Sequence, residues 1–114
     1  MKPDISGTGH FWQQRATAVA NVPLVIFLVW FIVSHLGAAR ADVVESIQYP
    51  ANAILLALSF ICIFWHMRLG MEMVIEDYVQ EARALRLSLL ANSIFTSVFG
   101  LAAIYAILKI FFGA

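Results

Sequence analysis

Charged and apolar positions divide the chain into three long uncharged stretches and the polar segments between them. The uncharged stretches cover residues 16–39, 51–67 and 87–108 and are 24, 17 and 22 residues long. A helix of roughly 20 apolar residues crosses a bilayer core about 30 Å thick. Lipid offers the backbone no hydrogen-bond partners, so each stretch is predicted to be a helix. The predicted membrane spans are residues 16–37, 51–73 and 87–110.

The segments between the spans differ in character. Residues 37–49 form a short polar link closed by Pro50, which suits the first turn of a helix. Residues 74–86 carry apolar and charged side chains at helical spacing, so this segment is expected to continue the second span or to lie along the membrane surface. The charged side chains in and just before this segment are interpreted as a solvated or partner-facing strip: Glu72, Glu76, Glu81, Arg83 and Arg86.

Lysine and arginine near the ends of the spans predict the orientation. Five lie at the N-terminus or around the second connector: Lys2, Arg15, Arg68, Arg83 and Arg86. Two lie on the opposite side: Arg40 and Lys109. We therefore predict an all-α membrane protein with a cytoplasmic N-terminus and a periplasmic C-terminus, built as a single transmembrane domain over residues 1–114.

Composition narrows the class of protein. The chain is 62% hydrophobic and 12% charged, whereas a soluble domain is about half apolar and about a quarter charged. Its 7 basic residues balance its 7 acidic ones, so no basic surplus indicates nucleic-acid binding. Three short-linked helices make a thin bundle with no soluble part large enough to be an enzyme. We expect a partner subunit, and the chain is not expected to be catalytic alone.

His66 is the first candidate for chemistry, because a titratable side chain inside a span is costly. Histidine coordinates metals, including haem iron, through a neutral ring nitrogen. Gly70 shares its helix face and is expected to leave room for a flat apolar macrocycle, beside the flexible Met67 and Met71. The alternative is a histidine that hydrogen-bonds to a carbonyl of a neighbouring helix, and this residue alone leaves both interpretations open.

Asp77 and Tyr78 are the next candidates. Asp77 follows His66 by eleven residues, so on a continuous helix the two share a face about 16 Å apart. A carboxylate and a hydroxyl suit a small polar ligand at the cytoplasmic interface, although tyrosines and charged residues also flank spans in general. Arg15 either marks the positive-inside boundary or binds an anionic group such as a haem propionate. His35 is expected to be a local hydrogen-bonding residue.

The motif H-x(3)-G-M-x(5)-D-Y, from His66 to Tyr78, resembles the small hydrophobic anchor subunit of succinate dehydrogenase, respiratory complex II. The R-A-T-A run that begins at Arg15 resembles the start of the first helix in that family, and "GTGHFWQQRATAVANVPL" is similar to the proteobacterial form. The resemblance implies that His66 is an axial ligand of haem b and that Arg15 lies near the haem propionates. It also implies that Tyr78 hydrogen-bonds ubiquinone, with Asp77 beside it.

The resemblance further implies partners in a bacterial inner membrane. A cytochrome b anchor subunit would supply the second axial ligand and share the quinone site with the iron–sulfur subunit. The chain has no glycine-rich nucleotide motif and a single cysteine. Flavin and iron–sulfur centres are therefore expected in a flavoprotein subunit and an iron–sulfur subunit.

Three alternatives stay open. The first is an anchor of a quinol-oxidising fumarate reductase, which runs the same reaction in reverse. The second is a small transporter or channel subunit, which needs a polar path and often an acidic residue inside a span; Glu72 is the only acid that the extended second span contains. The third is a structural anchor without a cofactor.

Overall fold

The computed structural model describes residues 3–113, which form four helices. They are α1 (Pro3–Ser34), α2 (Arg40–Gln48), α3 (Pro50–Tyr78) and α4 (Ala82–Phe111). Three of them, α1, α3 and α4, are long and apolar enough to cross a membrane. The prediction of an all-helical protein with three spans is therefore confirmed. Lys2, which contributes to the predicted orientation, lies outside the described residues.

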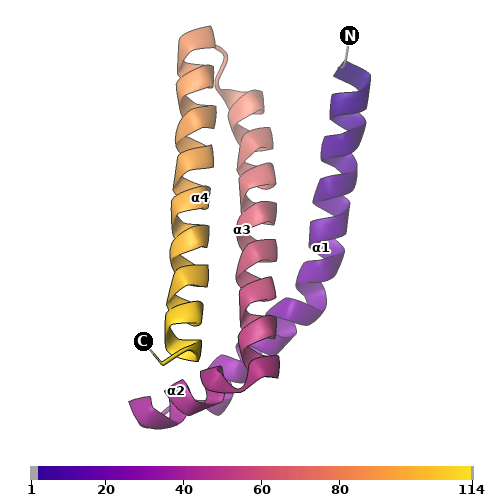
Figure 1. The fold of residues 1–114 in the computed structure, drawn as a ribbon. Coiled ribbons are helices and arrows are strands. Elements are labelled where there is room, and N and C mark those ends of the chain that lie inside the picture. The colour runs from indigo at the N-terminus through magenta and orange to yellow at the C-terminus, as the bar shows by residue number, and fades with distance from the viewer. Residues whose placement is uncertain (1–2, 114) are drawn as a thin grey trace.

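Helix α3 lies between α1 and α4 and packs along both. Figure 1 shows the three long helices running alternately up and down, with the short α2 crossing the end at which α1 finishes and α3 begins. The start of α1 and the connection from α3 to α4 both lie at the other end. The predicted cytoplasmic segments thus share one end of the molecule, while the side of the membrane that they face stays a prediction.

The ends of the helices follow local chemistry. Pro50 occupies the first turn of α3 as predicted, where its missing N–H leaves no broken bond. The carboxylate of Glu81 caps α4 by accepting from the N–H groups of Arg83 at 3.1 Å and Ala84 at 2.8 Å. Of the two alternatives for residues 74–86, continuation of the second span holds as far as Tyr78, where α3 ends, and residues 82–86 already belong to α4. The polar link before Pro50 contains α2, which the sequence pattern did not predict.

Large apolar side chains mostly face outward. Among the described residues, the buried hydrophobic ones are Phe31, Ala53, Leu56, Leu69 and Ile107. Lipid is as apolar as these side chains, so helices in a bilayer associate through close packing and interhelical hydrogen bonds. Three polar side chains are buried between the helices here: Ser59, Asn92 and Thr96. These three side chains are small enough to let the helices pack closely, and that of Asn92 also bonds α4 to α3.

The side chains of Asn92 and Thr96 form different kinds of hydrogen bond. Asn92 donates from Nδ2 to the Arg68 carbonyl of α3 at 3.0 Å, as expected of an amide between helices. Thr96 instead donates to carbonyls of its own helix, at 2.9 Å to Asn92.

Pro23 lies within α1, and Figure 1 shows that α1 bends in the half nearer to α2. A proline removes one backbone hydrogen bond and kinks a helix.

Candidate functional site

His66 lies half-buried on the face of α3 that packs against α1. Its Nδ1 atom is 2.9 Å from the hydroxyl oxygen of Thr17 on α1. That same hydroxyl is 2.8 Å from the Gln13 carbonyl and 3.2 Å from the Gln14 carbonyl. Among the described side chains, Nε2 of His66 has no hydrogen-bond partner. The ring is thus held at one nitrogen by a hydroxyl, rather than by a carbonyl of a neighbouring helix, and its other nitrogen is available.

Gly70 lies one turn beyond His66 and also faces α1. A Cβ atom built on Gly70 would lie 3.6 Å from Nε2 of Gln14, an ordinary van der Waals distance. The Gln14 side chain therefore fills the space beside this glycine. The expectation that Gly70 leaves room for a flat macrocycle stays a prediction, because the contact comes from the far end of a flexible side chain.

Asp77 and Tyr78 lie in the last turn of α3 and are both exposed, Tyr78 by 81%. Because α3 is continuous from Pro50, the predicted alignment of His66 and Asp77 on one face is confirmed. No side-chain hydrogen bond of either residue is found within residues 8–113. Their carboxylate and hydroxyl are therefore free to meet a ligand or a partner chain at this end of the molecule.

Arg15 is exposed, and its guanidinium lies 4.9 Å from the centre of the Phe11 ring. It precedes Thr17 by two residues, which is about 200° around a helix. Arg15 therefore lies on the side of α1 away from His66, and the structure does not bring the two residues together. Its place near a haem propionate stays a prediction.

A polar cluster that sequence reasoning missed joins α1 to α3, near the end of the molecule where α1 begins and α3 finishes. Glu72 accepts from His10 Nε2 at 3.3 Å and pairs with the guanidinium of Arg68 at 3.3 Å. Trp65 Nε1 donates to Gln13 Oε1 at 3.3 Å. The Glu72 side chain is only 20% exposed, so the solvated alternative does not fit this residue, and the partner-facing alternative stays a prediction. His10 and Glu72 are 62 residues apart, and no local spacing connects them.

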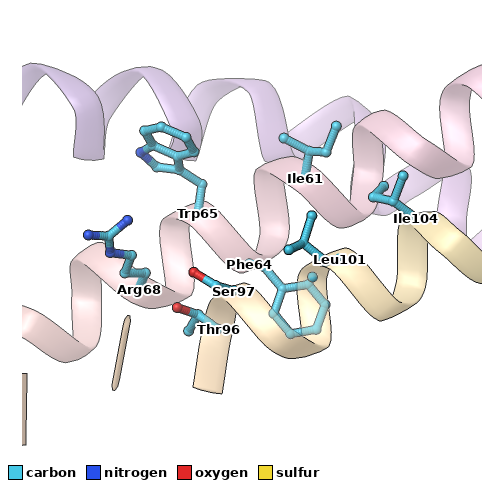
Figure 2. A pocket seen from close by; sticks show the side chains of 9 residues that line it. Ile61, Phe64, Trp65, Arg68, Thr96, Ser97, Leu101 and Ile104 are labelled. Carbon is cyan, nitrogen blue, oxygen red and sulfur yellow. The ribbon is translucent and has the colours of Figure 1, made fainter. Parts of the chain in front are cut away.

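Two hollows open beside this cluster. The first, about 410 Å³ in volume, lies between α1 and α3 and is lined by Gly9, His10, Gln13, Trp65, Arg68, Leu69 and Glu72. The second, about 260 Å³ in volume, lies between α3 and α4 and is lined by the residues that Figure 2 draws. Trp65 and Arg68 line both, so the hollows adjoin on one side of α3. Neither is lined by His66, Asp77 or Tyr78.

His35, at the opposite end of the molecule, has a structural role. Its Nδ1 lies 2.6 Å from the Phe31 carbonyl and its Nε2 lies 2.7 Å from the Ser46 hydroxyl of α2. Both ring nitrogens are thus engaged by the protein. The prediction of a local hydrogen-bonding residue is confirmed, and the contrast with His66 is direct, because Nε2 of His66 has no partner among the described side chains.

These features define a class: a small multi-pass membrane protein with a histidine held by one nitrogen inside its central span. Within that class, the chain belongs to the succinate dehydrogenase/fumarate reductase transmembrane subunit family, whose family model matches residues 2–100.

Individual relatives agree with this assignment. The chain is 31% identical over 77 residues to the succinate dehydrogenase membrane anchor subunit of Reclinomonas americana, a match that covers 65% of this chain and 64% of that protein. It is 28% identical over 102 residues to the succinate dehydrogenase hydrophobic membrane anchor subunit of Rickettsia bellii, over 90% of this chain and 82% of that protein. The chain thus spans slightly less than two thirds of the Reclinomonas relative. No solved structure matches the chain. The resemblance to this anchor subunit is confirmed.

Haem is the group that the resemblance implies, and the donor chemistry at His66 fits it. A ligating histidine in proteins usually donates its second ring N–H to an oxygen acceptor, and the Thr17 hydroxyl is such an oxygen at 2.9 Å from Nδ1. No group of three or more metal-ligating side chains occurs within the described part of the chain. The Nδ1 contact would hold the His66 ring so that Nε2 could bind such an iron.

Proposed function

We propose that this chain anchors succinate:ubiquinone oxidoreductase in the bacterial inner membrane. In this proposal it shares haem b and the ubiquinone-reduction site with a cytochrome b anchor subunit and docks the flavoprotein and iron–sulfur subunits. The observation that carries the proposal is His66, a histidine inside the central span with Nδ1 engaged by Thr17 and Nε2 available. Family membership supports the same function.

His66 would contact the iron through Nε2, and the haem, when bound, supplies one-electron redox chemistry. The partner anchor subunit would provide the second axial ligand. Arg15 is exposed on the far side of α1, so it would meet a propionate only where the group reaches around α1 or where the partner subunit brings it close.

Tyr78 and Asp77 would serve the quinone. Reduction of ubiquinone to ubiquinol takes up two electrons and two protons, and the electrons come from succinate as it is oxidised to fumarate. The Tyr78 hydroxyl would donate a hydrogen bond to a quinone carbonyl and so stabilise negative charge that develops on it. The Asp77 carboxylate would relay protons from the aqueous side. Since Tyr78 is 81% exposed here, the walls of such a site have to come largely from partner subunits.

The direction of the reaction is the remaining choice within the family, because the family description names both succinate dehydrogenase and fumarate reductase. Both named relatives are succinate dehydrogenase subunits, which favours succinate oxidation. Family membership leaves the transporter alternative without support.

Purification through a tag on this chain tests the proposal. The complex is extracted from membranes in mild detergent, its polypeptides are identified, and its rates of succinate-dependent ubiquinone reduction and quinol-dependent fumarate reduction are compared. We expect flavin and iron–sulfur subunits to co-purify and the succinate-dependent rate to be the larger. Recovery of the tagged chain without these subunits, from membranes that retain full succinate dehydrogenase activity, would contradict the proposed function.

A further inference from the structure

We propose that Thr17 is a positioning residue for His66: it accepts a hydrogen bond from Nδ1–H and thereby reserves Nε2 for the iron. This inference rests on the proposed function, because it assumes that His66 is a haem ligand. Thr17 lies on α1 and His66 on α3, so the contact also makes the site depend on the pairing of these two helices.

The inference depends on which neighbouring atom receives the hydrogen of the Thr17 hydroxyl. The Thr17 hydroxyl has a single hydrogen to donate and three neighbours: the Gln13 carbonyl at 2.8 Å, the Gln14 carbonyl at 3.2 Å and His66 Nδ1 at 2.9 Å. A carbonyl can only accept. If the hydroxyl donated to Nδ1, two oxygens would face each other at 2.8 Å with no hydrogen between them. If it donates to the Gln13 carbonyl, its oxygen is free to accept from Nδ1–H, and every close contact is favourable.

The tautomer that follows is the one an axial ligand needs. With the proton on Nδ1, the lone pair lies on Nε2, and the ring orientation is fixed before any iron arrives. A hydrogen bond from Nδ1–H also raises the basicity of the ligand. A more basic ligand stabilises the oxidised iron relative to the reduced iron, so this contact is expected to lower the haem reduction potential.

Other contacts between α1 and α3 hold Thr17 in register with His66. On one side, Trp65 Nε1 donates to Gln13 Oε1 at 3.3 Å. On the other side, the small and fully buried Ser59 lets α1 pack closely on α3, with its hydroxyl oxygen 3.4 Å from the Leu24 carbonyl. The hydroxyl of Thr17 is therefore aligned from both directions along α1, as a residue that positions a ligand requires.

The test compares Thr17→Val with Thr17→Ser in the complex purified through this chain. Valine has nearly the same shape as threonine but no hydroxyl, whereas serine keeps the hydroxyl. The measurements are the haem-to-flavin ratio and a potentiometric titration of the haem, both of which are independent of quinone reductase activity. For Thr17→Val we expect a higher reduction potential and haem affinity reduced by roughly 10- to 100-fold, the usual effect of removing such a partner. Thr17→Ser should match the wild type in both.

Each outcome separates this inference from the proposed function. A Thr17→Val complex with wild-type potential and haem content would overturn the inference, provided that His66→Ala loses the haem signal. An unchanged haem signal in His66→Ala would instead overturn the haem-ligand part of the proposed function. If Thr17→Val does not assemble, Thr17→Ala removes the hydroxyl without adding bulk, and the same two results decide the matter.

Discussion

Replacing Ser59 by leucine should loosen the site at His66 from a distance, through the packing of α1 on α3. Ser59 is 0% exposed. Its hydroxyl donates to the Leu55 carbonyl of its own helix at 2.7 Å and lies 3.4 Å from the Leu24 carbonyl of α1. A leucine side chain here would have to displace α1. Ser59 precedes His66 by seven residues, or about 10 Å along the helix, so a shift of α1 would also separate Thr17 from His66.

The size of the effect follows from overpacking. Extra methylene groups in a well-packed interior cost about 1–3 kcal/mol, which changes the equilibrium between docked and displaced α1 by roughly 5- to 150-fold. The matched control is Ser59→Ala. This variant loses the hydrogen bond from the Ser59 hydroxyl to the Leu55 carbonyl. Because the backbone N–H of residue 59 also donates to that carbonyl, the expected cost is under about 1 kcal/mol.

The assay is loss of haem absorbance as the purified complex is heated. We expect Ser59→Leu to lower the midpoint temperature clearly and to reduce the haem-to-flavin ratio, while Ser59→Ala stays near the wild type. If Ser59→Leu matches Ser59→Ala in both measurements, α1 does not pack against α3 at this position, and the link from packing to the histidine is refuted.

Further predictions concern α4 and the end of α3. Gly100→Ala should be tolerated, since the added Cβ would lie 3.6 Å from Phe64 Cβ. Gly100→Leu should instead displace Phe64 and lower the midpoint temperature at which the complex loses haem absorbance. Equal midpoint temperatures for the two variants would contradict this packing. Tyr78→Phe should slow ubiquinone reduction by roughly tenfold, the value of one hydrogen bond of about 1.4 kcal/mol, while haem content and dye-linked succinate oxidation stay unchanged. Asp77→Asn should also slow ubiquinone reduction, and an unchanged rate in either assembled variant removes that residue from the proposed mechanism.

The fold was largely predictable because lipid imposes a simple rule. A backbone in hydrocarbon must satisfy its own hydrogen bonds, so stretches without charge translate directly into helices. The continuity of α3 into the polar segment was also predictable from helical spacing, and it places Asp77 on the face of His66. The short helix α2 was missed, because nine residues with few apolar positions carry almost no periodic signal.

The environment of His66 was not predictable from spacing. Thr17 and His66 are 49 residues apart, and their contact depends on which face of α1 meets α3 and in what register. Hydropathy gives neither, because in a membrane helix the apolar residues surround all sides. Thr17 was visible only as part of the R-A-T-A run, in which Arg15 drew attention, although the two face opposite ways. The Glu72 cluster was missed for the same reason, since its partner His10 lies on another helix.

A reduced-minus-oxidised optical spectrum tests directly whether His66 binds haem, as we propose. The spectrum is recorded on the complex purified through a tag on this chain, for wild type and for His66→Ala, with the flavin and iron–sulfur subunits quantified in both. We expect a b-type haem signal in the wild type that is lost or shifted in His66→Ala while those subunits remain bound. An identical haem signal in an assembled His66→Ala complex, or no haem in the wild-type complex, would contradict it.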